Sequence, residues 1–182
     1  IGGDNSITYS VATGLWGSQI NNAGLITFDA HHDLRDGKTN GSPVQRLVNA
    51  GLSGTRIVQI GIADFSNSPQ YAQRAKDHGI TIIPRSELRN RSSESVIAQA
   101  LEIAGCADGP IHVDFDVDVC DRSVVPGCPA AAPGGISAAG SAHKRGVCCG
   151  QGSEHTGSKE QYRQVPYTKA VSTGTHTVPY TK

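Results

Sequence analysis

The sequence predicts a three-layer α/β/α fold with a mostly parallel β-sheet, and two observations carry this prediction. Short apolar runs alternate with amphipathic stretches as far as Ile136, which is typical of βαβ units with helices on both faces of a sheet. Two acidic runs, 29–33 and 114–118, lie at the ends of apolar runs. Functional groups of parallel sheets gather beyond the carboxyl ends of the strands, so the positions of both acidic runs agree with this fold.

Cap and turn residues divide this region into eight predicted elements. The first helix follows a Gly-Gly turn and the polar residues Asn5 and Ser6, which favour helix entry. Two later helices begin with a Ser-Pro pair, which places proline in the first turn, and each is followed by a glycine. The strands are short apolar runs bounded by polar turns. In chain order we expect a helix at 6–15, a strand at 25–29, a helix at 42–50, a strand at 56–62, a helix at 68–77, a strand at 80–83, a helix at 93–103 and a strand at 111–115.

Composition excludes several classes of function. The chain has 182 residues, which is most simply one domain, and equal numbers of basic and acidic residues, 16 each. It therefore lacks the charge excess that binds nucleic acid or anionic membranes, and no apolar run approaches the ~18–20 residues that span a bilayer. The five cysteines show no CxxC spacing, which favours reduced thiols over a disulfide framework or a zinc site. We expect a cytoplasmic protein that acts on a small-molecule substrate.

The two acidic runs offer alternating side chains that can bind metal ions. They are Asp29, His31 and Asp33 in the first run and Asp114, Asp116 and Asp118 in the second. Because side chains alternate along an extended chain, each set can project toward one crevice. Carboxylates with a single imidazole suit Mn²⁺ better than structural Zn²⁺. Carboxylates can also bridge two ions ~3.5–4 Å apart, which turn a water held between them into hydroxide. This hydroxide would be the nucleophile, so no catalytic side chain is assigned.

Three segments of the sequence resemble the signature segments of the ureohydrolases, the family of arginase, agmatinase and formimidoylglutamase. The segments are Gly2-Gly3-Asp4-Asn5-Ser6, Asp29-Ala30-His31-His32-Asp33 and Asp116-Val117-Asp118-Val119-Cys120-Asp121. After the third segment, Pro126-Gly127 and Gly134-Gly135 stand at the family's spacing. This register selects Asp116 and Asp118 over Asp114 as ligands. The resemblance covers roughly residues 1–137 and implies an arginase-like sheet.

The resemblance also implies two Mn²⁺ ions with a defined set of ligands. Asp29 and Asp116 would bridge the two ions. His31 and Asp118 would complete one ion, and Asp33 would complete the other. The family usually supplies a histidine to that second ion where this chain has Asn5. Because an amide is a weaker ligand than an imidazole, one of the two ions is expected to be loosely held.

Two further positions bear on the substrate. Arginases and agmatinases typically carry a His-Gly-x-Pro segment where this chain has Asn40-Gly41-Ser42-Pro43, and the absence of this histidine argues against those two activities. Asp33-Leu34-Arg35 resembles the formimidoylglutamase motif D-A-H-x-D-x-R, and an arginine suits a bidentate clasp on a substrate carboxylate. The resemblance thus implies hydrolysis of N-formimidoyl-L-glutamate to glutamate and formamide, a step of histidine degradation. Relatives in this family form trimers or hexamers.

Alternatives remain open for the function and for single residues. The chain could be an amidinohydrolase of the agmatinase, guanidinobutyrase or arginase type, or an inactive metal-binding fragment. A nucleotide-sugar transferase that uses the Asp116–Asp118 pair is a further alternative, although no Gly-rich phosphate loop supports it. Arg35 could pair with Asp33 or Asp36 instead of a substrate. We expect turn or cap roles for Asp36, Asp114 and Asp121. We expect His32 to be a neighbour of the ligands, and His78 and His112 to be surface or packing residues.

The two ends of the chain differ from its middle. Only Ile1 precedes the glycine turn, so we expect the strand that normally leads into such a turn to be missing. After residue 137 the apolar runs stop. The expected organisation is a ureohydrolase-like metal-binding core at 1–137 and an atypical polar tail at 138–182 that is disordered or out of frame. We therefore interpret the chain as a fragment that is incomplete at both ends and lacks the family's later acidic strand.

Overall fold

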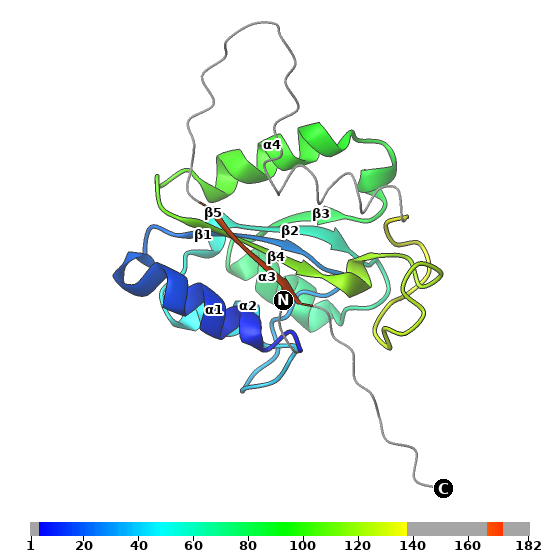
Figure 1. Cartoon of the computed structure of the whole chain (residues 1–182), viewed down its shortest axis with the longest axis horizontal. Helices are drawn as coiled ribbons and strands as arrows, with labels where there is room; N and C mark the ends of the chain where they lie inside the picture. Colours follow the sequence, from blue (N-terminus) through cyan, green and yellow to red (C-terminus); the bar gives the residue numbers. More distant parts are fainter. Residues whose placement is uncertain (1–3, 138–166, 173–182) are drawn as a thin grey trace, which may run out of the picture.

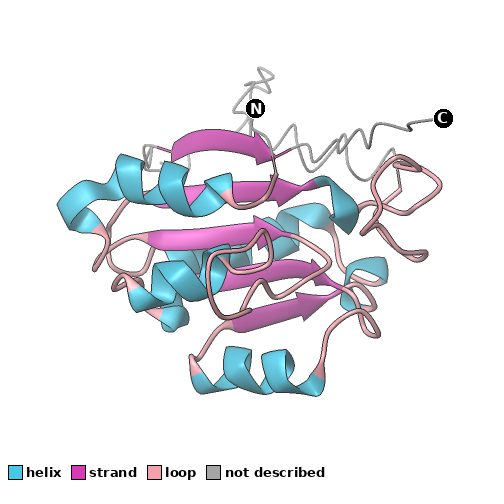
Figure 2. Ribbon diagram, turned by 90° about the horizontal axis from the view of Figure 1, so that it is seen from below, coloured by secondary structure: helices cyan, strands magenta, loops and turns pink. Residues whose placement is uncertain are grey.

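The structure is a computed structural model that describes residues 4–137 and a strand at 167–172. Parallel strands form one sheet in the order β3-β2-β1-β4-β5, with β1 in the middle (Figures 1 and 2). The strands are β1 Gly24–Phe28, β2 Ile57–Ile62, β3 Thr81–Pro84, β4 Ile111–Asp116 and β5 Tyr167–Ser172. The parallel sheet and its flanking helices confirm the predicted α/β fold.

Helices cover both faces of this sheet. The helices α1, α2 and α3 lie on one face and α4 lies on the other (Figure 1), in agreement with the predicted layer order. The α-helices are α1 Ile7–Trp16, α2 Pro43–Asn49, α3 Pro69–Asp77 and α4 Ser93–Ala104, and the short 3-10 turns are η1 Gly17–Gln19, η2 Gly54–Arg56, η3 Glu87–Arg89 and η4 Val117–Val119. All eight predicted elements occur, with their ends displaced by one residue at most. None of the described helices has both the length and the apolar character needed to cross a bilayer.

Serine caps begin two of the helices. Ser68 Oγ accepts a hydrogen bond from the Tyr71 N–H at 3.4 Å before α3. Ser92 Oγ accepts one from the Ser95 N–H at 3.2 Å before α4. Each bond satisfies an N–H group that the start of a helix leaves without an intrahelical partner. The cap of α4 lies within the long connection from β3 to β4.

Two apolar clusters hold the layers together, one on each face of the sheet. Phe28 of β1, Ile60 of β2 and Val96 of α4 belong to the first cluster. Leu25 of β1 and Leu47 of α2 belong to the second. Alternate residues of β1 therefore enter opposite clusters, and every residue of β1 and β2 is buried. Strands covered on both faces are nearly continuous apolar runs, which is why the sequence identifies them.

The face under α1 and α2 becomes polar toward the carboxyl ends of the strands. Thr27 of β1 lies opposite Gln59 of β2 on one side and Asp114 of β4 on the other. All three side chains are buried. They form a polar row beside the apolar cluster that contains Leu25. The packed core on this face thus gives way to polar groups near the edge where both acidic runs begin.

The order of the strands defines a switch point at the centre of the sheet. From β1 the chain passes to β2 and β3 on one side, and α4 then carries it back to β4 on the other side of β1. The carboxyl ends of β1 and β4 are therefore neighbours whose following loops diverge. In open α/β sheets this is the usual place for a binding site. The acidic runs 29–33 and 114–118 both lie there.

The strand β5 differs from the sequence prediction. It lies within the segment 138–182, which was expected to be disordered or out of frame, but residues 167–172 pair with β4 in parallel. Without β5, β4 would be an edge with unpaired N–H and C=O groups, and the tyrosine, threonine and valine of this segment favour strands. The rest of the predicted tail, residues 138–166 and 173–182, lies outside the described residues.

Replacing Leu47 by alanine should lower the free energy of unfolding by about 2–5 kcal/mol, because Leu47 is fully buried and alanine leaves a cavity. Leu101→Ala is the matched control. Leu101 lies on α4 with 46% of its surface exposed, so its truncation should change the free energy of unfolding by ~0.5 kcal/mol or less. Urea unfolding followed by circular dichroism measures both variants, and equal losses would contradict the place of Leu47 in the core.

Candidate metal centre

Asp29 is the first residue after β1, and the sheet holds it in place. Its N–H donates to the Ile60 carbonyl of β2 at 3.1 Å, and only 2% of its surface is exposed. The chain then leaves the sheet, and the Ala30 carbonyl accepts a hydrogen bond from the Ala63 N–H at 3.0 Å. The end of the central strand thus presents the buried Asp29 carboxylate. Hydrogen bonds hold the backbone at Asp29 and at the next residue, Ala30.

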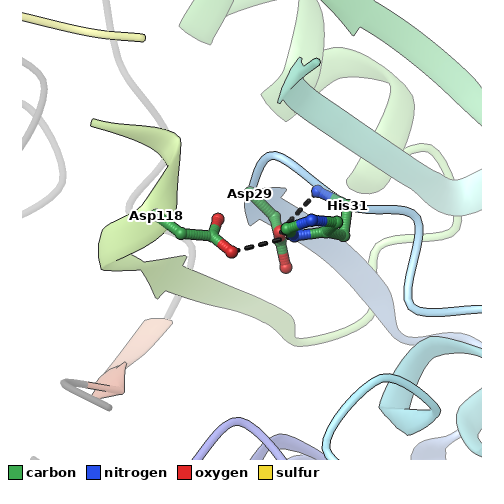
Figure 3. A group of neighbouring side chains, drawn as sticks. All are labelled: Asp29, His31 and Asp118. Carbon is green, nitrogen blue, oxygen red and sulfur yellow. Dashed lines mark hydrogen bonds and ion pairs between the residues drawn. The ribbon is translucent and has the colours of Figure 1, made fainter. Parts of the chain in front are cut away.

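Asp29 and His31, which follow β1, meet Asp118, which follows β4, at this edge (Figure 3). His31 Nδ1 lies 2.8 Å from Asp118 Oδ2 and 3.5 Å from Asp29 Oδ1. The His31 N–H donates to Asp29 Oδ1 at 2.6 Å, and the Ala30 N–H donates to Asp118 Oδ1 at 3.0 Å. One potential ligand atom from each of the three side chains lies within 4.8 Å of the other two. Three of the predicted ligands therefore form one donor group.

Asp116 ends β4 and starts a turn rather than a longer strand. Asp116 Oδ1 accepts a hydrogen bond from the Asp118 N–H at 2.9 Å, which begins η4. The expectation that Asp114, Asp116 and Asp118 alternate toward one crevice differs from this structure. Asp114 stays inside β4, whereas the turn brings Asp118 to His31. An aspartate that bonds to a nearby N–H offers the backbone an alternative to an extended conformation.

Asp33 ends the first acidic run in a left-handed conformation, with a φ of 54°. This conformation is uncommon for residues other than glycine, although aspartate visits it. The Asp33 carboxylate accepts a hydrogen bond from Asn5 Nδ2. Asn5 Nδ2 also donates to the Asn40 carbonyl at 3.1 Å, and Asn5 Oδ1 accepts from Thr8 Oγ1 at 3.2 Å. Asn5 is therefore next to Asp33, a place compatible with the prediction that it replaces a ligand of the second ion.

We refer to Asp29, Asp33, Asp116 and Asp118 as the acidic cluster. Burial raises the pKa of Asp29 well above its usual value, and the neighbouring carboxylates, Asp33 first, raise it further. Burial raises the pKa of Asp33 to about 6, against the lowering effect of the Asn5 hydrogen bond. Burial and then the charge of Asp118 raise the pKa of Asp116 to about 7. Three members of the cluster therefore resist carrying their negative charge in the absence of a cation.

His31 and Asp118 favour each other's charged form. The hydrogen bond to Asp118 raises the pKa of His31, although burial opposes this shift. Burial also acts to raise the pKa of Asp118, but the hydrogen bond and charge of His31, together with the Ala30 N–H, hold that pKa below its usual value. Across the described part of the chain, His31 is the only basic side chain that forms an ion pair with the acidic cluster.

This donor set fits divalent cations. Four carboxylates and one imidazole are mostly hard oxygen ligands, which suit Mn²⁺ and ions like it. One imidazole cannot neutralise four carboxylates, and buried charge is unfavourable unless it is paired or binds a metal ion. A divalent cation would supply the missing positive charge. The predicted ligands and the predicted metal are therefore compatible in their chemistry.

The predicted substrate residues, Arg35 and Asn40, lie on the loop that follows Asp33. Arg35 is exposed, and within the described residues its guanidinium has no hydrogen bond or ion pair. Asp36 pairs with Arg74 instead, at 2.9 Å, so the alternative pairing of Arg35 with Asp36 does not occur. Asn40 faces Asn5 through its backbone carbonyl rather than its side chain. The loop thus leaves the Arg35 guanidinium available for another partner.

Two side chains that the sequence analysis did not single out hold the loop after β1. Gln59 Oε1 lies 2.7 Å from His32 Nδ1, and Gln59 Nε2 donates to the His32 carbonyl at 2.8 Å. Asn67 Oδ1 accepts from the His32 N–H at 3.1 Å, and Asn67 Nδ2 donates to the Ala30 carbonyl at 2.9 Å. A glutamine inside an apolar strand is a signal that could have revealed Gln59. Asn67 lies in a polar turn, where nothing in the sequence marks it.

Other acidic and histidine side chains lie apart from the donor group. Asp121 Oδ1 accepts from the Ser123 N–H at 2.9 Å, which is the expected turn role. Asp114 differs from that expectation, because it is buried within β4 and burial raises its pKa to about 7. His112 is fully buried, with its ring edge-on to Trp16 at a centroid distance of 6.1 Å, which is the expected packing role.

Comparison with known proteins points to one family. Residues 1–143 match the model of the arginase family. The formimidoylglutamase of Bacillus subtilis is 38% identical over 141 residues, which cover 75% of this chain and 44% of the B. subtilis protein. The chain therefore spans less than half the length of this relative.

Solved structures show the same likeness. The crystal structure of formimidoylglutamase from B. subtilis superposes with a TM-score of 0.76 and 35% sequence identity, and the match covers 82% of this chain and 48% of that one. The crystal structure of Trypanosoma cruzi formiminoglutamase with Mn²⁺₂ gives a TM-score of 0.69 and 27% identity, covering 79% and 49% of the two chains. The likeness thus extends over most of the chain.

Without metal, the thermal stability should fall as the pH rises from about 5 to 8. The pKa values of Asp33 and Asp116 are about 6 and about 7 in the folded protein, against ~3.9 in an unfolded chain. These two carboxyl groups bind more protons in the folded state over this interval, so the stability that they contribute is fully present below pH ~4 and is lost as the pH rises through 6 and 7. Thermal melts in chelator at both pH values measure the decrease, which should amount to several degrees.

Saturating Mn²⁺ should show the opposite dependence, because the ion binds deprotonated carboxylates. The rise in melting temperature that Mn²⁺ causes should therefore be larger at pH 8 than at pH 5. A metal-free protein that gains stability over the same interval would contradict the raised pKa values.

Asp118→Asn should weaken Mn²⁺ binding by more than ~100-fold, because it removes a predicted ligand, whereas losing the partner of a ligand typically costs ~10–100-fold. Asp114→Asn is the matched control, since Asp114 is as buried as Asp118 but lies outside the donor group. Calorimetric titration with Mn²⁺ measures both variants. Equal weakening in the two would exclude a specific role for Asp118.

Proposed function

Because the chain belongs to the arginase family, we propose that it carries out metal-dependent hydrolysis of a C–N bond in a linear amidine, preferably a formimino compound. The observation that supports this best is the meeting of Asp29, His31 and Asp118 at the switch point between β1 and β4. The B. subtilis and T. cruzi relatives are named formimidoylglutamase and formiminoglutamase. Since the chain spans 44% of the B. subtilis protein, the activity of the whole relative extends to this chain as a proposal.

We assign two Mn²⁺ ions to the acidic cluster. Asp29 and Asp116 would bridge the ions, His31 and Asp118 would complete one, and Asp33 would complete the other. The T. cruzi structure with Mn²⁺₂ supports this assignment. When bound, the ions supply Lewis acidity and activate water near neutral pH. The second ion would be held less firmly, because Asn5 stands where the family usually has a histidine.

The chain's own residues prepare the site for this chemistry. The N–H groups of Ala30 and His31 orient the carboxylates of Asp118 and Asp29, so these ligands need little rearrangement when a cation binds. His31 binds a cation only as a neutral ring, so the proton that Asp118 stabilises on it must leave on binding. Burial of Asp29 and Asp118 keeps bulk water away from this part of the site.

We propose N-formimidoyl-L-glutamate as the substrate, on the strength of Arg35. Its guanidinium, which has no partner in the described chain, can bind a substrate carboxylate through two parallel N–H···O bonds. Water oxygen would add to the formimino carbon, and the bond from this carbon to the glutamate nitrogen would break. The nitrogen would receive a proton, and the products would be glutamate and formamide. Guanidino compounds are the second candidate substrates, as in agmatinase, guanidinobutyrase or arginase, and an inactive metal-binding fragment is the remaining alternative.

We also propose a cytoplasmic location and association into homo-oligomers. Cys106 and Cys128 are free thiols, which suits a reducing compartment. The trimer or hexamer is expected from the family resemblance and is measured directly by sedimentation of the purified chain.

The Mn²⁺-loaded chain should release formamide from N-formimidoyl-L-glutamate, and Arg35→Met should raise KM for this substrate about 10–100-fold, because hydrogen bonds to charged groups contribute ~1.5–3 kcal/mol. Arg35→Lys should be affected less, since it keeps the charge but loses the planar fork. Lys38→Met is the control for loss of a cation on the same exposed loop and should leave KM unchanged. Steady-state assays of the four proteins measure these effects.

Three outcomes would count against the proposal. Turnover of arginine or agmatine without turnover of N-formimidoyl-L-glutamate would overturn the substrate. Two Mn²⁺ sites without turnover of any of these compounds would favour the inactive metal-binding alternative. A chain that binds no Mn²⁺ at all would overturn the proposed function.

A further inference from the structure

Arg85 is a buried cation at the same edge of the sheet as the acidic cluster. It directly follows β3, and only 5% of its surface is exposed. Its guanidinium forms no ion pair with a carboxylate in the described part of the chain. A buried charge is costly unless it is paired or fully hydrogen-bonded. The Arg85 guanidinium therefore depends on hydrogen bonds to neutral groups.

Within the described part of the chain, the hydrogen-bond partners of the Arg85 guanidinium are backbone carbonyls, and they come from three separate segments. Nη2 donates to the Asp118 carbonyl at 2.8 Å, and Nε donates to the Gly61 carbonyl at 3.1 Å. Nη1 donates to the carbonyls of Ala132 and Pro133, each at 3.4 Å. One guanidinium thus joins the end of β2, the turn η4 and the loop that follows it.

The end of β2 is shaped for this contact by a bulge at Gly61. The pairing of β2 with β3 shifts between Ile60 and Ile62, which leaves Gly61 outside the ladder and its carbonyl available to Arg85. Gly61 has a φ of 96°, which favours glycine. A Cβ there would also overlap the side chain of Val119, next to Asp118. The bulge therefore lets β2 approach η4 closely with Arg85 between them.

The loop after η4 folds back onto the same turn. The Asp121 N–H donates to the Ile136 carbonyl at 2.9 Å, and the Ile136 N–H donates to the Val119 carbonyl at 3.0 Å. Arg85 adds bonds to Ala132 and Pro133 inside this loop. The loop therefore holds the residues just after Asp118, and Arg85 holds the Asp118 carbonyl itself.

We propose that Arg85 is a positioning residue of the metal centre, which fixes the turn η4 so that the Asp118 carboxylate stays directed at His31 and the Ala30 N–H. The inference rests on the proposed metal-binding function of this site. Arginine suits the role because its planar group has five N–H donors in a fixed fork, whereas lysine has three donors at one point. Lysine keeps the charge but cannot reach three segments at once. The arrangement of the guanidinium N–H groups, rather than the positive charge alone, therefore sets the role of Arg85.

Arg85→Lys in the full chain should weaken Mn²⁺ binding about 10–100-fold, the range typical for loss of a partner that orients a ligand. The matched control is Arg56→Lys. Arg56 also ties backbone carbonyls together, donating from Nε to Ala23 at 2.9 Å and from Nη2 to Asn21. These contacts lie at the opposite, amino-terminal edge of the sheet. Both variants should lose stability, but Arg56→Lys should bind Mn²⁺ as tightly as the unaltered chain.

Calorimetric titration with Mn²⁺, urea unfolding and the electron paramagnetic resonance spectrum of the bound ion distinguish the outcomes. A changed spectrum and weaker binding in Arg85→Lys alone would support the proposal. Unaltered binding in Arg85→Lys, or equal weakening in both variants, would overturn it. If Arg85→Lys does not fold, Arg85→Gln is used, and failure of both to fold would overturn the proposal in favour of a general role in stability. A wild-type chain that binds no Mn²⁺ would instead refute the proposed function.

Discussion

Four carboxylates at one edge of the sheet, three of them buried and Asp116 half-buried, are the constraint on which the rest of the structure depends. Asp29, Asp33, Asp116 and Asp118 share one imidazole as their basic partner within the described chain. Like charges repel more strongly in a protein interior than in water, so the arrangement is unfavourable until protons or cations neutralise it. The chain places this cluster at the switch point between β1 and β4. Loops diverge there, so polar groups do not have to interrupt the two apolar clusters.

Repelling groups stay together only if other parts of the molecule fix their backbones. Four side chains outside the cluster do this with hydrogen bonds to backbone groups of the loops after β1 and β4, namely Gln59, Asn67, Arg74 and Arg85. Gln59 lies in β2, Asn67 in the loop between β2 and α3, Arg74 in α3, and Arg85 directly after β3. The strands β2 and β3 lie on the side of β1 away from β4. The strands β2 and β3 and the segments beside them thus support the predicted ligands on the loops after β1 and β4. This division explains why polar residues are buried in an otherwise apolar region.

The sequence predicts the local parts of this arrangement better than the tertiary ones. Ser-Pro starts, glycine stops and apolar runs locate the elements because caps and burial act over a few residues. The same reasoning places Asp29 and Asp118 at strand ends. It misses the turn at Asp116, which depends on a single local hydrogen bond. It also misses the left-handed backbone conformation of Asp33, which depends on its neighbour Asn5. Arg85 and β5 are also missed, because their partners are backbone groups far away in sequence, and a backbone carbonyl leaves no pattern in the order of side chains.

The two halves of the acidic cluster differ in how firmly neighbouring groups hold them, and this difference would link the proposed metal binding to the loop that carries Arg35. The Asp118 carboxylate accepts bonds from His31 and Ala30, which the sheet and Arg85 hold in place. Asp33 depends mainly on Asn5, whose amide also binds the Asn40 carbonyl at the far end of the loop that carries Arg35. A cation that draws Asp33 toward itself would disturb the bonds of Asn5. In the proposed two-ion site, occupancy of the weaker ion and the position of the loop that carries Arg35 would therefore be coupled through the Asn5 amide.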